Sequence, residues 1–444
     1  MKEYVEDIPS SLISAFINKQ EVRIKRLSPK SLSVRTSKEI DINNLKVAFY
    51  IFNESDYIEL DIEKYEVISI KKEKFCIIYE LNVNNKEYEH NVRRVVRDYL
   101  NYINLRVFGC EGEFSRDMIG YPAELDYDYY ENHNLELEEW MAEIDEDAWN
   151  GIELGEVELA IQLDNYDRYY DFLSMNIDEF KDYYFSRNYI RNNTLLHKEL
   201  TRIYIGNEFC HNLFPDVELL ISMLDKCYKT SLDITICTTY MMEHHASYYI
   251  DMIDRIYRWC RESNYRVEIV INDYGMIDLL SDKVDYISMS LGCLLNKRKR
   301  DPRYKYKRDI AMHPRLISQN ILNNSRYIEL LEDNKIYRHE YESCGYIMDI
   351  AVGYNSLHLP FYQTNTSQLC PLYAKVTYNN RGYQISVDNC GRLCRKFYFS
   401  YPKHLKMLGR YNSIFAFDRD ILDNDNIIRS YISQGIDRIV LNFL

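Results

Sequence analysis

Four cysteines in the chain have a spacing that could hold a metal centre. Three of them occur late in the sequence, at Cys370, Cys390 and Cys394, and the last two are four positions apart. That separation puts both sulfur atoms on one side of a helical turn or tight loop. The fourth, Cys210, follows a run that is typical of a buried strand. If the end of this strand faces the late loop, four thiolates converge, as an iron–sulfur cluster or a structural zinc ion requires.

We expect an iron–sulfur cluster, although zinc also accepts four thiolates and spacing alone does not separate the two. Structural zinc sites favour two close cysteine pairs, and here only Cys390 and Cys394 form one. A radical S-adenosylmethionine enzyme would need another cysteine three positions after Cys394, where the chain has Phe397. The remaining cysteines are typical of small buried hydrophobic residues, and Cys293 and Cys344 are the alternative ligands among them.

Other polar residues could act on a substrate. Asp273 could orient a substrate or transfer a proton, or it could simply cap the helix that follows. Arg300 and Arg303, in a cationic segment, could each bind a carboxylate or phosphate through two hydrogen bonds, or lie in a solvated loop. The adjacent His244 and His245 could serve as ligands or in acid–base chemistry.

The elements that must position these residues alternate, from residue 201 onward, between short apolar runs and helical stretches. The candidate strands are residues 203–205, 234–237, 267–271, 286–291, 336–341, 357–362, 414–417 and 439–441. Eight strands alternating with helices in about 240 residues predict a parallel sheet closed into a (β/α) barrel. Such barrels carry their chemistry at the carboxyl ends of the strands, and Cys210, Asp273 and Cys370 each follow a candidate strand.

The first 198 residues are organised differently. Residues 1–110 contain short runs rich in β-branched and aromatic side chains, which predict a small β-barrel or sandwich and then a helix from about Val92 to Leu105. Residues 111–198 are acidic, and their apolar residues predict amphipathic helices over 156–173 and 177–190. We therefore expect an α/β protein with a β-rich module (1–110), an acidic helical connection (111–198) and a barrel domain (199–444).

Composition restricts the class of protein. With 46% hydrophobic residues, the chain is typical of ordered globular proteins. Its formal net charge of −14 disfavours broad, sequence-independent binding to nucleic acid. We expect no membrane span, because no run of about 18 apolar residues occurs. The 11 cysteines, without a visible secretory signal, predict a reducing, cytoplasmic location.

Three segments, Gly206–Cys210, Asn272–Gly275 and Leu291–Arg303, resemble peptidase family U-32, also called collagenase-like. Within that family they are most similar to the branch of oxygen-independent ubiquinone hydroxylation proteins, and the resemblance covers residues 200–444. The branch holds a 4Fe–4S cluster with one early and three late cysteines. The resemblance therefore implies Cys210, Cys370, Cys390 and Cys394 as cluster ligands. Cys293 departs from the pattern, which has an arginine at this position.

The same resemblance implies an anaerobic hydroxylase, or a subunit of one, that acts on a small molecule or a modified macromolecule. Related hydroxylases are thought to take oxygen from prephenate, so a dicarboxylate held by Arg300 or Arg303 is a candidate donor. A paralogous barrel subunit is a candidate partner. Two alternatives stay open: a non-catalytic scaffold stabilised by the cluster, and a peptidase. The chain contains neither a Gly-x-Ser-x-Gly nor a His-Glu-x-x-His motif.

The N-terminal module faintly resembles the PilZ domain, a small β-barrel that binds cyclic di-GMP. Arg23, Arg26 and Ser28 correspond to that family's arginine pair and turn serine. The arginines are three positions apart instead of four, and Ser31 stands where a glycine is expected. The alternative is a degenerate barrel used for ligand sensing or docking.

Overall fold

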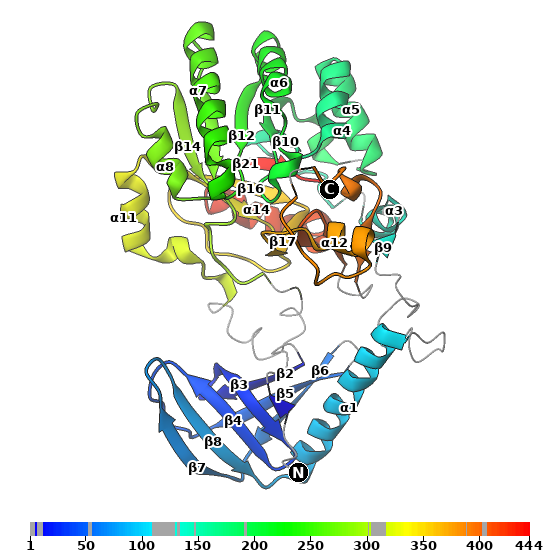
Figure 1. Ribbon diagram of the computed structural model, residues 1–444, viewed down its shortest axis with the longest axis vertical. Coiled ribbons are helices and arrows are strands. Elements are labelled where there is room, and N and C mark those ends of the chain that lie inside the picture. The colour runs from blue at the N-terminus through cyan, green and yellow to red at the C-terminus, as the bar shows by residue number, and fades with distance from the viewer. Residues whose placement is uncertain are drawn as a thin grey trace. The chain divides into compact units, whose positions relative to one another are not determined.

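The computed structural model describes residues 5–6, 12–51, 56–108, 129–130, 134–145, 148–190, 193–300, 302, 317–387, 389–401 and 406–444. The chain divides into two compact units (Figure 1). The first comprises residues 1–127, 303–314 and 401–405, and the second comprises residues 128–302, 315–400 and 406–444. None of the helices in the described ranges has the length and apolar character that a membrane span requires.

The first unit contains an antiparallel sheet with strand order β6-β5-β2-β3-β4-β8-β7, and β1 pairs with β3. The strands are β1 (Val5–Glu6), β2 (Ile13–Ile17), β3 (Gln20–Ser28), β4 (Ser31–Thr36), β5 (Leu45–Ile51), β6 (Asp56–Ile62), β7 (Tyr65–Lys72) and β8 (Ile77–Val83). Helix α1 (Lys86–Phe108) contacts β3, β5 and β6. The β-rich character predicted here is confirmed, but within the described ranges the sheet has end strands, β6 and β7, rather than a closed ring.

The second unit is built around a closed barrel of eight strands, all of whose neighbouring pairs are parallel. In order they are β10 (Glu158–Leu163), β11 (Leu200–Ile205), β12 (Asp233–Cys237), β13 (Val267–Ile271), β14 (Ile287–Leu291), β15 (Ile336–Glu342), β16 (Tyr354–Leu359) and β21 (Ile436–Leu441). Every residue of β13 is buried. Continuous apolar runs of this kind are typical of parallel strands covered on both faces.

Helices connect most of the barrel strands, as Figure 1 shows for α4 to α8. They are α4 (Tyr166–Ser174), α5 (Ile177–Arg187), α6 (Val217–Lys229), α7 (Ala246–Ser263), α8 (Gly275–Leu280), α11 (Ser325–Asp333), α13 (Arg419–Asp423) and α14 (Asp425–Ser433). Polar residues start them: Asp216 accepts a backbone N–H of α6, and Asn176 forms a reciprocal cap with Glu179 at α5. A further helix, α3 (Asn134–Ala142), precedes the barrel.

A small antiparallel sheet, in the order β17-β20-β19-β18-β9, lies beside the barrel in this unit. Its strands are β17 (Phe361–Thr366), β18 (Tyr398–Ser400), β19 (Met407–Arg410), β20 (Ser413–Phe417) and β9 (Tyr129–Tyr130), and α12 (Pro371–Tyr378) follows β17. Most of this sheet is inserted in the chain between β16 and α13. The insertion carries the three late cysteines.

Two predictions about the barrel are wrong. Residues 414–417 form β20 of the inserted sheet, not a barrel strand. The barrel instead begins with β10, inside the segment predicted as a helix over 156–173 and as part of a helical connection. Leu159, Ala160, Ile161 and Leu163 form a short apolar run, and periodicity alone does not separate such a run from a helix turn.

Candidate metal centre

Cys210 lies just beyond the carboxyl end of β11, in a turn that requires glycine. Gly206 has a φ of +118°, and a Cβ atom there would lie 2.4 Å from the carbonyl oxygen of Cys237. The Oδ1 atom of Asn207 then accepts the backbone N–H groups of Phe209 (2.9 Å) and Cys210 (2.8 Å). This turn holds the Cys210 side chain, which is buried, at the carboxyl ends of the barrel strands.

Cys370 caps the amino end of α12. Its Sγ atom accepts the N–H of Tyr373 at 3.3 Å and donates to the carbonyl oxygen of Tyr411 at 3.1 Å. Pro371 occupies the first turn of the helix, where its missing N–H costs nothing. A helix amino end favours negative charge and hence a thiolate. Burial outweighs this effect and raises the pKa of Cys370 to about 11.

Cys390 and Cys394 lie between α12 and β18. Next to Cys394, Arg395 forms a two-pronged ion pair with Asp167 on α4, with nitrogen–oxygen distances of 3.0 and 2.5 Å. The pair is solvent-exposed, so it fixes the position of the loop more than it stabilises the fold.

Two asparagines connect the barrel to the inserted segment. The Nδ2 atom of Asn412 donates to the carbonyl oxygens of Phe209 and Ser367, at 2.6 Å each. Phe209 directly precedes the early cysteine, and Ser367 comes three residues before the first late one. Asn212 donates through Nδ2 to the carbonyl oxygen of Val387 at 2.8 Å. These contacts hold segments that are distant in sequence against each other.

The four cysteine side chains act electrostatically on one another. Burial raises the pKa of Cys210 well above its ordinary value, and Cys394, Cys370 and Cys390 raise it further. Burial also raises the pKa of Cys394 to about 12, against a lowering effect of Arg410. The structure thus brings together the four side chains that the sequence singled out.

The four sulfur atoms are not already drawn together in the geometry of a single zinc site. A Zn–S bond of about 2.3 Å in a tetrahedron separates neighbouring sulfur atoms by about 3.8 Å. Within the described residues, no three of the four Sγ atoms all lie within 4.8 Å of one another. A cluster of several iron and sulfide ions occupies more space between its cysteines than one ion does.

Arg410 provides a buried positive charge beside the thiols. Its Nε atom donates to the carbonyl oxygen of Cys394 at 3.4 Å, and its Nη1 atom has no hydrogen-bond partner among the described residues. A buried charged donor without a partner is costly, by more than the roughly 1–3 kcal/mol of a neutral one. A metal–thiolate centre carries negative charge that would offset this cost, so the residues present fit such a group.

Asp273 has backbone partners for both of its carboxylate oxygens. Oδ1 accepts the N–H of Gly275 at 2.8 Å, and Oδ2 accepts the N–H of Met241 at 3.2 Å. These bonds match the capping alternative, because they stabilise the turn that leads into α8.

Arg300 is held by protein groups. Its guanidinium lies 3.0 Å from the Oε2 atom of Glu342, and it donates to Gln363 and to the carbonyl oxygens of Cys293 and Asn296. A substrate carboxylate would have to exchange with Glu342 to bind there. Arg303, the other predicted clamp, lies outside the described residues.

The predicted histidine pair lies near the turn of Cys210. The rings of His244 and His245 are 4.2 Å apart between centroids, and His245 is 4.4 Å from His211. His211 directly follows Cys210, so the histidines and the early cysteine share one region of the barrel end.

Sequence reasoning missed a second cluster inside the barrel, formed by Glu208, Cys293 and His358. Cys293 was considered only as an alternative ligand for the four-cysteine centre. His358 lies within an otherwise apolar predicted strand, and a buried ionisable residue in such a run was the available signal. Next to it, Glu340 is buried on β15. Burial alone would raise its pKa, but the hydrogen bond and charge of His358, with Arg438, lower the pKa of Glu340 to about 2.

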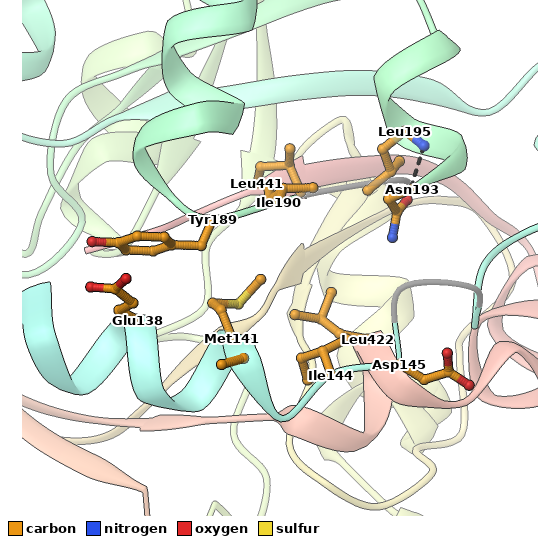
Figure 2. Close-up of a pocket in the computed structure, with 11 residues that line it drawn as sticks. Glu138, Met141, Ile144, Asp145, Tyr189, Ile190, Asn193, Leu195, Leu422 and Leu441 are labelled. Atoms are coloured by element: carbon orange, nitrogen blue, oxygen red, sulfur yellow. Dashed lines mark hydrogen bonds between the residues drawn. The ribbon is translucent and has the colours of Figure 1, made fainter.

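Two of the pockets in the described part of the chain lie away from the four cysteines of the candidate centre. The first, of about 380 Å³, is lined by Glu138, Met141, Ala142, Ile144, Asp145, Tyr189, Ile190, Asn193, Leu195, Leu422 and Leu441. Figure 2 shows the carboxylates of Glu138 and Asp145 on opposite sides of its apolar residues. The second, of about 290 Å³, lies in the first unit, and its cationic lining includes Arg23, Arg35 and Lys74.

The other residues of the PilZ-like segment have local partners. Arg26 forms an ion pair with Glu6 at 2.6 Å, and the Oγ atoms of Ser28 and Ser31 lie 2.7 Å apart. Of the predicted arginine pair, only Arg23 lines the cationic pocket.

Comparison with known proteins identifies no family. No family model matches the chain, and no curated protein matches it. The crystal structure of an uncharacterised protein from Legionella aligns with 22% of this chain and 94% of its own, at 18% sequence identity and a TM-score of 0.17. A similarity this weak carries no argument about fold or function.

Proposed function

We propose that this chain is an iron–sulfur protein whose 4Fe–4S cluster is held by Cys210, Cys370, Cys390 and Cys394. One observation carries the proposal: four cysteines from distant segments of the chain interact electrostatically within one unit. Such a cluster, with each iron held by one cysteine, would supply electron transfer.

The surrounding residues have defined roles in this proposal. Arg410 offsets the negative charge of the thiolates, and the amino end of α12 favours ionisation of Cys370. Asn207 and Asn412 position Cys210 against the inserted segment. His244 and His245, near the same turn, are candidates to move a proton to or from a bound substrate.

For the activity, we propose an oxygen-independent hydroxylase or a subunit of one, on a barrel of (β/α) type. Its support is the resemblance of the segments around Cys210, Asn272 and Leu291 to family U-32. Helices after β11, β12, β13 and β14 agree with this barrel type. The substrate we propose is a small molecule or a modified macromolecule in the cytoplasm, with a paralogous barrel subunit as a candidate partner. A dicarboxylate donor at Arg300 would exchange with Glu342.

Metal analysis tests the cluster. We expect four iron and four acid-labile sulfide ions per chain in anaerobically purified protein, with broad visible absorbance. Replacement of any of the four ligands by serine should remove most of both. The matched control is Cys227→Ala, a buried cysteine on α6, which should keep them. One zinc per chain with no sulfide overturns the proposal.

Turnover separates the hydroxylase from a scaffold. The loaded protein should transfer oxygen from a dicarboxylate donor to an acceptor, alone or with a paralogous subunit. A protein with a full cluster and no turnover would instead be a scaffold, and the cationic pocket with Arg23 would then be its candidate site for an anionic ligand.

A further inference from the structure

Three potential metal ligands meet inside the barrel, and none of them belongs to the proposed cluster. A carboxylate oxygen of Glu208, the Sγ of Cys293 and a ring nitrogen of His358 all lie within 4.8 Å of one another. All three residues are buried. Glu208 follows β11, Cys293 follows β14 and His358 is the fifth residue of β16, so three strands deliver them to one end of the barrel.

We propose that Glu208, Cys293 and His358 bind one divalent transition-metal ion, with zinc as the best fit. Carboxylate, thiolate and imidazole are the three side-chain ligand types that zinc accepts. Zinc–ligand distances of about 2.0–2.3 Å place neighbouring ligand atoms about 3.3–3.8 Å apart, so from separations of at most 4.8 Å any closing movement is at most about 1–1.5 Å. Three protein ligands leave one tetrahedral position open, as in catalytic zinc sites.

A second layer of hydrogen bonds orients these ligands. The Nε2 atom of His358 lies 2.9 Å from Oε2 of Glu340, and Nδ1 takes no part in this contact. Glu340 is itself fixed by the Oγ of Ser290, at 2.6 Å. On the other side, Nδ2 of Asn272 donates to Oε2 of Glu208 at 2.9 Å. A carboxylate bonded to the second nitrogen of a histidine is a recurring feature of metal sites, where it fixes the ring.

Glu208 has no arginine or lysine of its own among the described residues. Within the described ranges, Glu208 has neutral hydrogen-bond donors, the amide of Asn272 and the backbone N–H of Cys293 at 3.3 Å, and no ion pair. Its neighbour Glu342, by contrast, is paired with Arg298 and Arg300. His358, which is paired with Glu340 at 2.9 Å, supplies positive charge near Glu208, and a divalent ion that takes the place of the His358 proton would neutralise Glu208 together with the Cys293 thiolate.

A thiol nucleophile is the rival interpretation. Cys293, His358 and Glu340 could be a nucleophile, a base and an orienting acid. Cys293 and His358 are each only 1% exposed, however, so a peptide could not reach the sulfur atom. An ion can enter where a peptide cannot, and the burial therefore favours the metal site.

The test is a zinc titration of the full-length protein. We expect the Cys370→Ser/Cys394→Ser double variant, which lacks the proposed cluster, to bind one Zn²⁺ per chain. Bound Co²⁺ should add a thiolate-to-cobalt absorption band. In the same background, His358→Gln or Cys293→Ser should weaken zinc binding by at least about 100-fold, since each removes a ligand. The matched control is His339→Gln, a buried histidine on β15 that is bonded to Asn355 and should leave binding unchanged.

Several results would overturn this proposal without touching the cluster. One such result is that neither the double variant nor the wild-type protein binds one zinc ion per chain. Another is that His358→Gln and Cys293→Ser both bind zinc as tightly as the double variant without these changes. If the protein takes up no metal and an alkylating reagent modifies Cys293 faster than the buried Cys237, the site is a thiol nucleophile and not a metal site. If replacement of a proposed cluster ligand by serine removes iron and leaves zinc bound, the two centres are separate.

Discussion

At the scale of single residues, burial controls the thiols of the proposed cluster. It raises the pKa of Cys370 to about 11 and that of Cys394 to about 12. Both side chains therefore keep their protons at neutral pH until a metal displaces them. Metal uptake releases these protons, and the affinity for metal should rise with pH.

The metal-free protein should lose stability as the pH rises above about 9. Cysteines of the unfolded chain ionise near 9.0, whereas Cys370 and Cys394 keep their protons to about 11 and 12 in the fold. The unfolded state binds fewer protons between these values, so the free energy of unfolding falls with increasing pH. Urea unfolding at several pH values measures this fall. It should be shallower in the Cys370→Ser/Cys394→Ser variant, and equal slopes would contradict the argument.

The turn before Cys210 should not tolerate a side chain. In Gly206→Ala, the new Cβ atom would clash with the carbonyl oxygen of Cys237 at a φ of +118°. We expect a loss of about 2–4 kcal/mol in the free energy of unfolding, together with reduced iron content. Gly155→Ala is the control, since Gly155 also has a positive φ (+52°) but open space around it. It should cost only about 1–2 kcal/mol and leave iron content unchanged.

At the scale of elements, the continuous apolar runs of the sequence predicted most of the barrel strands. β11 to β15 lie where those runs are, because strands buried on both faces contain little else. β10 was missed because its short run lies in an acidic segment, and β20 was misassigned because an antiparallel strand can have the same pattern. The pair Cys390 and Cys394 was identifiable from spacing, and Cys210 from its place after an apolar run and from the resemblance to family U-32. Asn412 was not, because its partner Phe209 is 203 residues away.

Asn412 should matter for metal binding as well as for stability. Asn412→Ala removes its bonds to the buried carbonyl of Phe209 and the partly buried carbonyl of Ser367 and leaves both oxygens without this donor. We expect a loss of about 2–3 kcal/mol and less than half of the wild-type iron content. Asn176→Ala, which removes the cap of α5, should cost about 1 kcal/mol and keep the iron. Equal iron in both variants would show that Asn412 does not position the ligands.

At the scale of the whole molecule, the chain has two compact units, each with its own sheet structure. The four cysteines all belong to the second unit. A ligand stabilises the unit that binds it, by mass action on the folded form.

Calorimetry of the full chain should therefore show two unfolding transitions. Removal of iron by a chelator should lower the temperature of one transition and leave the other unchanged. Variants with one of the four proposed ligands replaced by serine should already unfold this unit at the lower temperature, and the chelator should not change it further. A single transition that moves as a whole would mean that the two units unfold together.

Strand β21 pairs with both β10 and β16, and so joins the earliest strand of the barrel to one made some two hundred residues later. During synthesis, the other seven strands of the barrel cannot close into a ring until residues 436–441 have left the ribosome. Until then, the polypeptide carries two open strand edges that can recruit neighbouring nascent chains. A frameshift or premature stop shortly before Ile436 should therefore yield insoluble product, and not merely a shortened protein.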